Sequence, residues 1–541
     1  MSSNLALPVE IYLPILEYID DLATLAALCG VDRGFLDLAR RKLYKYVWVR
    51  PWEAVPERKF DGLFSTLSQS TEIAALVERL DVIYYPLASR NDWPTICNQA
   101  LSNLKSLTSL TWTRDRSLGF EHLETLASLD RLTKLEINGN RLDLNQLTAI
   151  QKLQNIREFK MHMPDSMMIT ALPGILKTWH GYGAPLESFE IITRDARYID
   201  DRLMIDIAPY LCKLKVFKLF GCRHVTPRGY FAVLREAGAT LEELGLEGVT
   251  HGDDEDQLDE DLYLERESAK TVGIRLPNLK RLFVSETVFL RLLQPDDSRR
   301  EQLYVERALA RHGPNGLNLA SIERDDRNLS QLGGTSFLPE RLEWLLLSRE
   351  RDSREYHRSV EASGRLSNIA QLWPEGLQRL WLSHLIVDFR DLDLIADKLP
   401  GLETLMIRLP PTKYPPQRIA KFLQKLPRLR VFHLQIAPET QTMSNDTLFS
   451  LEDMQLIARE AGPQLAQIGF FNRIFTVRRK RTLTTEVVEE RPRAWARIDP
   501  PEDEPKGPST VQIMVEHEEV YLEPWQRGSL SVPEIFQVWR V

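Results

Sequence analysis

The sequence predicts an α/β protein in which a small helical module precedes a long solenoid of stacked repeats. Two observations carry this prediction: an apolar pattern recurs through most of the chain, and the first fifty residues show a different, helical spacing. The repeat stops near residue 472, and strand-like runs follow it. We therefore expect three parts, residues 5–50, 70–472 and 473–541.

The repeated pattern is apolar-x-x-apolar-x-apolar, and it begins at Val77. Most neighbouring units are 24 to 30 residues apart, which is the period of leucine-rich repeats. Each unit ends in a short strand whose two apolar residues face inward, and stacked units share one core. The alternative is chance clustering of leucines in a helical array. The middle apolar positions are Leu80, Leu110, Leu135, Phe159, Phe189, Phe217, Leu244, Leu282, Leu345, Leu380, Leu405, Phe432 and Ile468.

Helix-like segments lie between the predicted strands, where leucine-rich repeats place the helices of their convex side. The irregular steps and the length of these segments resemble the ribonuclease-inhibitor-like class, which implies a horseshoe. The clearest segments are Asn145–Leu153, Leu203–Leu211, Arg228–Ala237 and Arg418–Leu426.

Three further segments depart from the repeat. Residues 251–265 hold seven acids between Asp253 and Asp261 and are predicted to be a solvated loop; an acidic docking strip is the alternative. Residues from about 290 to 338 are highly charged and form either a degenerate repeat or an insertion. Residues 473–541, with strand-like runs at Phe475–Val477 and Val511–Val515, are expected to form an irregular β-containing cap.

The N-terminal module reads as three short helices. Apolar residues recur at helical spacing in Glu10–Tyr18, Leu22–Cys29 and Arg33–Tyr44. Asp20 and Asp21 break the first helix and are suited to cap the second. So small a module buries little surface and typically gains stability from a partner or an adjoining domain.

Residues 5–49 resemble the F-box, and the ending LYKYVWV is the form common in fungal F-box proteins. The resemblance covers about 45 of the 541 residues. An N-terminal F-box followed directly by leucine-rich repeats is more specific than either feature alone. The alternative is an unrelated three-helix cap of the solenoid. The matching positions are Leu7, Pro8, Ile11, Ile15, Ile19, Leu22, Leu25, Leu28, Phe35, Ala39, Leu43 and Tyr44.

The resemblance implies a substrate receptor of an SCF-type cullin–RING ubiquitin ligase. In that family the F-box docks on the Skp adaptor, which leads to a cullin, and the repeats hold a protein substrate. The receptor acts by raising the local concentration of substrate lysines near a catalytic cysteine on another chain. The alternative is a leucine-rich-repeat scaffold or inhibitor with no ubiquitin role. The resemblance places against the adaptor Leu7, Pro8, Ile11, Leu16, Leu25, Leu28 and Cys29.

A candidate substrate surface follows from the repeat register. The residue between the two inward positions of each strand points out onto the concave face. In the C-terminal half these residues are large and mostly apolar, and Trp, Met and Arg are enriched at interfaces. We expect a protein substrate to dock there with Trp381 as its anchor, unless the insertion or the tail covers the stripe. The predicted substrate-binding residues are Phe283, Trp344, Leu346, Arg379, Trp381, Met406, Arg408 and His433.

Charge, cysteine usage and hydropathy limit which class of partner and which cellular compartment we expect. A net charge of −8 argues against nucleic acid or an anionic membrane as the main partner. No run approaches the length of a membrane span, and no signal peptide is recognisable. The four cysteines, Cys29, Cys97, Cys212 and Cys222, are scattered, which favours a reducing compartment. We expect a soluble protein of the cytoplasm, the nucleus or both.

The motifs of common enzyme classes are missing from the sequence, so we expect no enzyme, no cofactor and no metal site. There is no phosphate-binding glycine loop, no zinc-protease motif, no nucleophile elbow and no C-x-x-C pair. His162 near Asp165 and Ser166 is interpreted as a surface loop, and Cys222 with His224 offers too few ligands for a metal. The basic run Arg478–Arg481 is either a charged edge strand or a nuclear address.

Overall fold

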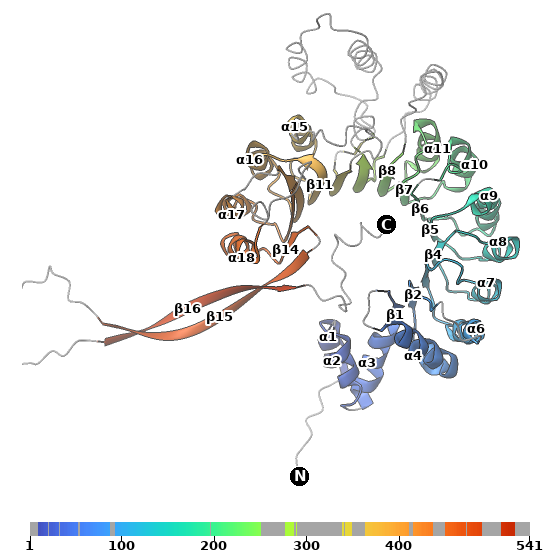
Figure 1. The fold of residues 1–541 in the computed structure, drawn as a ribbon, viewed down its shortest axis with the longest axis horizontal. Helices are drawn as coiled ribbons and strands as arrows, with labels where there is room; N and C mark the ends of the chain where they lie inside the picture. The colour runs from blue at the N-terminus through green and yellow to red at the C-terminus, as the bar shows by residue number, and fades with distance from the viewer. Residues whose placement is uncertain are drawn as a thin grey trace, which may run out of the picture. The chain divides into compact units, whose positions relative to one another are not determined.

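The computed structural model describes residues 9–19, 21–31, 33–51, 55–86, 92–194, 196–249, 276–285, 288, 338–339, 341–348, 363–410, 415–436, 449–471, 473–489 and 510–524. The chain divides into two compact units, formed mainly by residues 1–358 and by residues 359–525. Strands and helices alternate in both units (Figure 1).

The first unit is built on a parallel sheet whose strands follow one another in sequence order. Leu80 pairs with Leu110, and Leu110 pairs with Leu135, so equivalent leucines of successive repeats form one buried row. Because each row continues across the repeats, the apolar core is shared between neighbours. The strands are β1 Tyr46–Val49, β2 Arg79–Val82, β3 Ser109–Trp112, β4 Lys134–Asn138, β5 Glu158–His162, β6 Ser188–Ile192, β7 Val216–Phe220, β8 Glu243–Glu247, β9 Arg281–Ser285 and β10 Trp344–Ser348.

In the first unit the helices lie on the outer side and the strands of the sheet on the inner side (Figure 1). Aspartates begin several of them by accepting backbone N–H groups of the first turn: Asp143 from Gln146 at 2.8 Å, and Asp200 from Leu203 at 2.9 Å. The helices are α4 Pro56–Gln69, α5 Thr71–Ala74, α6 Trp93–Asn103, α7 Phe120–Ala127, α8 Leu144–Gln151, α9 Ser166–Gly181, α10 Asp201–Ile207, the 3₁₀ turn η1 Ala208–Tyr210 and α11 Pro227–Ala237.

Three helices precede the sheet: α1 Val9–Glu17, α2 Leu22–Leu28 and α3 Arg33–Lys45. The carboxylate of Asp21 accepts the backbone N–H of Thr24 at 2.7 Å, which confirms the predicted cap of the second helix. Helix α3 runs directly into β1, so the module and the sheet are joined without a linker.

The second unit repeats the same alternation and ends in a hairpin. Strand β15 pairs antiparallel with β14 and then with β16, and Figure 1 shows this hairpin reaching well beyond the helices of its own unit. The parallel strands are β11 Arg379–Ile386, β12 Thr404–Leu409, β13 Val431–Ile436 and β14 Gln467–Phe470; the helices are α15 Ser363–Leu372, α16 Phe389–Lys398, α17 Pro416–Gln424 and α18 Leu451–Glu460; the hairpin strands are β15 Arg473–Glu489 and β16 Thr510–Pro524.

The predicted α/β repeat fold is confirmed. All thirteen predicted strand positions lie on strands, and the four predicted helical segments coincide with α8, α10 with η1, α11 and α17. One strand was not predicted: the sheet begins at Tyr46, inside the segment assigned to the N-terminal module. The acidic run 251–265, the charged segment 290–337 and residues 490–509 lie outside the described residues.

Glycines at strand ends give a direct test of how tightly successive repeats stack. Gly221 follows β7 with φ +75°, and a Cβ there would clash with the carbonyl oxygen of Thr193. Gly221→Ala should therefore lower the free energy of unfolding by about 3 kcal/mol, because left-handed strain and overpacking add. Gly62 in α4 has open space, so Gly62→Ala should raise it by about 0.5–1 kcal/mol. Urea unfolding measures both, and equal effects would contradict this stacking.

Candidate functional site

The three N-terminal helices enclose a small core of their own. Leu16, Leu25 and Ala39, one from each helix, are 3%, 0% and 0% exposed. The rings of Tyr12 and Phe35 lie 4.3 Å apart between their centroids and extend this core. At the end of α1, the ammonium group of Lys42 donates to the carbonyl oxygens of Leu16 and Glu17, and the Leu16 oxygen also accepts the N–H of Ile19 at 3.1 Å.

A second face of α1 is apolar but exposed. Ile11 and Ile15 are 43% and 42% exposed, and Tyr18, just after the helix, is 89% exposed. Pro14 lies between them and is also exposed. Positions i, i+3, i+4 and i+7 share one side of a helix, so these four side chains form a single strip, here termed the α1 stripe.

The predicted adaptor-facing residues divide into four groups. Ile11 lies in the α1 stripe. Leu16 and Leu25 are buried in the core of the module, so they hold the helices together and are not on its surface. Leu28 and Cys29 are partly buried against that core. Leu7 and Pro8 lie outside the described residues.

A buried polar cluster attaches the module to the repeats. The hydroxyl of Tyr46 on β1 donates to Oδ2 of Asp81 on β2 at 2.6 Å, and Arg50 donates to the Tyr46 oxygen at 2.7 Å. Arg79 forms an ion pair with the same fully buried Asp81 at 3.1 Å. Burial and the Asp81 carboxylate raise the pKa of Tyr46, so its hydroxyl keeps the proton that it donates. Removing one member would leave another buried and unsatisfied.

Charged side chains pair across the strand face that points away from the helices. Lys160 lies 3.2 Å from Glu136 and 3.8 Å from Glu190, on the strands to either side. Lys218 continues the series by contacting Glu190 and Glu243. This alternation leaves few unbalanced charges on the face. The series runs Glu136, Lys160, Glu190, Lys218, Glu243 and Arg281.

Glu136 is a buried acid of that series, at 7% exposed. Burial alone would raise the pKa of its carboxyl, but the hydrogen bond from His162 at 2.7 Å and the charge of Lys160 outweigh it. The hydroxyl of Thr111 adds a further hydrogen bond at 3.0 Å. The pKa therefore lies well below its usual range, and Glu136 stays ionised as an anchor of this ladder. His162 is held by Glu136, while Asp165 caps α9, so these two side chains have separate partners.

The predicted substrate residues of the first unit lie together on its last two strands. Leu346 on β10 pairs in register with Phe283 on β9. The rings of Phe283 and Trp344 pack edge to face, with centroids 4.7 Å apart. All three side chains are buried, at 4% exposed for Phe283, 8% for Trp344 and 5% for Leu346.

Three of the predicted substrate residues in the second unit form a row across its strands. Trp381, Met406 and His433 pair in register across β11, β12 and β13, and they are 2%, 1% and 4% exposed. Gly469 continues the row on β14, and a Cβ there would clash with the His433 ring, so this ring packs directly on the glycine backbone. Arg379 and Arg408 are partly exposed on β11 and β12. Burial favours a packing role for this row, and substrate contact stays a prediction.

The other residues that the sequence singled out, the Cys222 thiol and the basic run, are packed or hydrogen-bonded within the fold. Cys222 is buried, which raises the pKa of its thiol above the ordinary value. No cluster of three or more His, Cys, Asp or Glu among the described residues is arranged to hold a metal ion. The basic run lies on β15, where Arg479 donates to the carbonyl oxygens of Ala458 and Gly462. None of the helices that the structure describes is long and apolar enough to cross a membrane.

Comparisons with known proteins add little beyond this geometry. No protein-family model and no curated protein matches the sequence. Among solved structures, the crystal structure of the Rad7 and Elc1 complex in yeast is similar: it is 12% identical, with 81% of this chain and 90% of that chain covered, at a TM-score of 0.38. A likeness of that size gives no evidence on partners or activity.

His433 provides a pH test of the row in the second unit. Burial lowers the pKa of its imidazole from 6.5 to about 4. Between these values the unfolded chain binds the proton and the folded chain does not, so stability falls as the pH drops from 6.5 towards 4, by about 3 kcal/mol in total. His433→Gln should remove this part of the pH dependence in urea unfolding curves. An unchanged slope between wild type and variant would contradict a buried neutral imidazole.

Proposed function

We propose that this chain is the substrate-recognition subunit of an SCF-type cullin–RING ubiquitin ligase. In this role α1 to α3 dock on a Skp adaptor, the adaptor leads to a cullin, and the repeats bind a protein substrate. The chain supplies no reacting group, because the transfer takes place at a cysteine of another protein. Its contribution is to hold substrate lysines near that cysteine. It works in the cytoplasm, the nucleus or both.

The α1 stripe is the observation that carries this proposal. One apolar face of helix α1, with Tyr12 and Leu16, packs into the module's own core, while Leu13 is exposed on its own at 51%. The other face, with Ile11, Ile15 and Tyr18, remains open to solvent. When an amphipathic helix binds in an apolar groove, its anchor side chains stand at positions such as i, i+4 and i+7. An exposed contiguous apolar strip on a small module marks an interaction site.

The connection between α3 and the sheet suits a subunit that positions one partner relative to another. Helix α3 leads without a break into β1, which pairs with β2 along its whole length. Tyr46 and Arg50 close the buried cluster around Asp81 at this junction. An adaptor bound at the α1 stripe would thus be connected to the first repeats by continuous secondary structure.

The alternative is a leucine-rich-repeat scaffold or inhibitor in which α1 to α3 only cap the end of the sheet. Leu16, Leu25 and Ala39 suit both functions, because both need a folded module. The α1 stripe separates them, since a cap has no use for exposed isoleucines on its outer face. The substrate-binding role of Trp381 and its neighbours remains part of the proposal and is independent of this choice.

A negative charge introduced into the α1 stripe tests adaptor binding directly. Ile15→Asp should weaken the binding of purified Skp adaptor to the full-length chain by about 30-fold, because a desolvated carboxylate replaces an apolar anchor. Isothermal titration calorimetry measures the change. The melting temperature should stay the same, since Ile15 is already 42% exposed.

Arg41→Asp provides the matched control, because Arg41 is an exposed residue of α3 outside the stripe. This variant should bind the adaptor like the wild type. A wild-type chain that does not bind Skp, or an Ile15→Asp variant that binds it unchanged, would favour the scaffold. A parallel titration with Elc1, the partner of Rad7 in the yeast complex, reports whether the chain prefers that adaptor.

A further inference from the structure

The hairpin of the second unit continues as a two-stranded ribbon beyond the parallel sheet. Strand β14 pairs with β15 only from Arg473 to Thr476, whereas β15 and β16 pair with each other as far as Glu489 and Thr510. Among the strands that the structure describes, β16 is the last of its sheet, so its outer edge has no strand beside it. A two-stranded ribbon is marginally stable in water, and a sheet usually needs three or more strands.

The half of the hairpin next to α18 is anchored within its own unit. Gln455 of α18 donates to the carbonyl oxygen of Val520 at 3.0 Å, and Arg479 donates to that of Ala458 at 2.9 Å. In this half, basic residues of β15 also stand opposite acids of β16, and opposite charges at such positions stabilise strand pairing. The opposing pairs are Lys480 with Glu519 and Arg481 with Glu518.

The outer half of β16 has a different composition. Residues 510–515 read TVQIMV and carry no charge, and every acid of β16 lies between Glu516 and Glu523. Val511, Ile513 and Val515 occupy alternate positions and therefore share one face of the strand. Valine and isoleucine favour strands, and an uncharged apolar run at an open edge is a template for pairing with another chain.

The two strands of the hairpin differ in how their open edges are protected. Natural sheets discourage pairing at an open edge with charged side chains or proline. Beyond its contact with β14, strand β15 carries the basic run Arg478–Arg481 and the acids Glu486 and Glu489. Residues 510–515 of β16 carry neither a charge nor a proline. The sequence therefore leaves this part of β16 open to pairing.

We propose that residues 510–516 of β16 pair antiparallel with the same residues of a second copy of this chain. The two hairpins would then form one four-stranded sheet around a two-fold axis. Ile513 would lie at the axis opposite the same residue of the second copy, and Val511 would lie opposite Val515. Two-fold dimers are the commonest homo-oligomers. This interface is separate from the α1 stripe, and it forms whether or not the adaptor binds.

The charge pattern of β16 favours a second copy and selects the register. The run Val-Gln-Ile-Met-Val has its β-branched residues placed symmetrically about Ile513, so two antiparallel copies match. In this register Glu516 stands opposite Thr510, and the remaining acids lie outside the paired segment. A register centred on His517 would place Glu516 opposite Glu518, and like charges directly opposite each other are destabilising.

The oligomeric state of the full-length chain tests this proposal. Sedimentation equilibrium at micromolar concentration should give a dimer. Ile513→Lys and Ile513→Glu should each raise the dissociation constant at least about tenfold, because like charges then meet at the axis. An equimolar mixture of the two variants should form the dimer again, because opposite charges then meet. This rescue distinguishes a contact at the axis from simple disruption of the hairpin.

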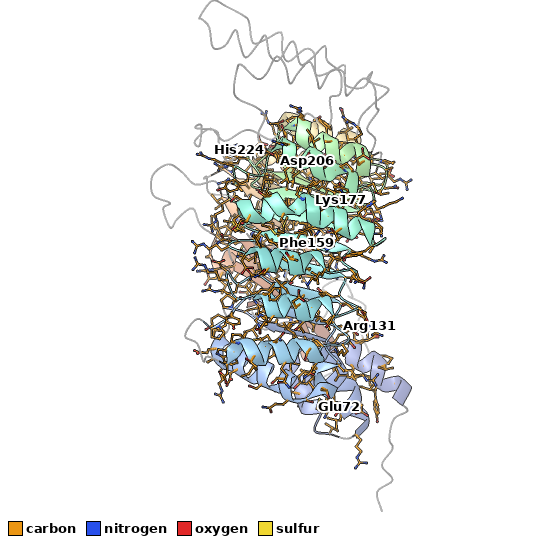
Figure 2. The ribbon with its side chains drawn as sticks, turned by 90° about the vertical axis from the view of Figure 1, so that its right-hand side faces the viewer. Glu72, Arg131, Phe159, Lys177, Asp206 and His224 are labelled. Carbon is orange, nitrogen blue, oxygen red and sulfur yellow. The ribbon has the colours of Figure 1, made fainter. Side chains whose placement is uncertain are left out.

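Ile205→Lys is the matched control, because it makes the same exchange at a 39% exposed side chain of α10. Asp206, the next residue, lies among the outer helices of the first unit (Figure 2). This variant should sediment like the wild type. A monomeric wild type, a dimer that Ile513→Lys leaves unchanged, or a mixture that stays monomeric would overturn the proposal. So would a monomer whose residues 510–516 gain protection from hydrogen exchange only with the Skp adaptor, since the edge would then bind another protein.

Discussion

The structure depends on one constraint: a single repeat cannot bury its own apolar face. Leu80, Leu110 and Leu135 are fully buried because each lies between the strands before and after it. The parallel register that aligns these leucines also aligns every other position of the repeat. Rows of charges, of loops and of helix starts are therefore consequences of the same stacking that forms the core.

A stack of repeats also has a first strand with no repeat before it, and in this chain the N-terminal helices precede that strand. Strand β1 would be an open edge without α1 to α3, and the Asp81 cluster joins them through Tyr46. The helices thus serve the fold through Leu16 and Leu25, and they retain the α1 stripe as a surface for another protein. One segment can serve both purposes because α1 is apolar on two sides.

The sequence predicts much of the fold because each repeat carries the same three apolar positions, and most repeats follow at a nearly constant spacing. Strand β1 was missed because Tyr44 stands where other repeats have leucine or another aliphatic residue, and because helical spacing runs up to it. Helical spacing located α1 correctly, but it could not decide which apolar face packs inward. The F-box resemblance placed Leu16 against the adaptor, and the structure buries that side chain in the core of the module.

The proposed receptor function depends most on α1 as the adaptor site, and hydrogen–deuterium exchange tests this directly. The full-length chain is compared with and without a Skp adaptor. We predict slower exchange in α1 and in the turn before α2, with the amides of β2 to β8 unchanged because they are already paired within the sheet. Unchanged exchange in α1, or protection confined to the repeats, would contradict the proposal that these helices dock the adaptor.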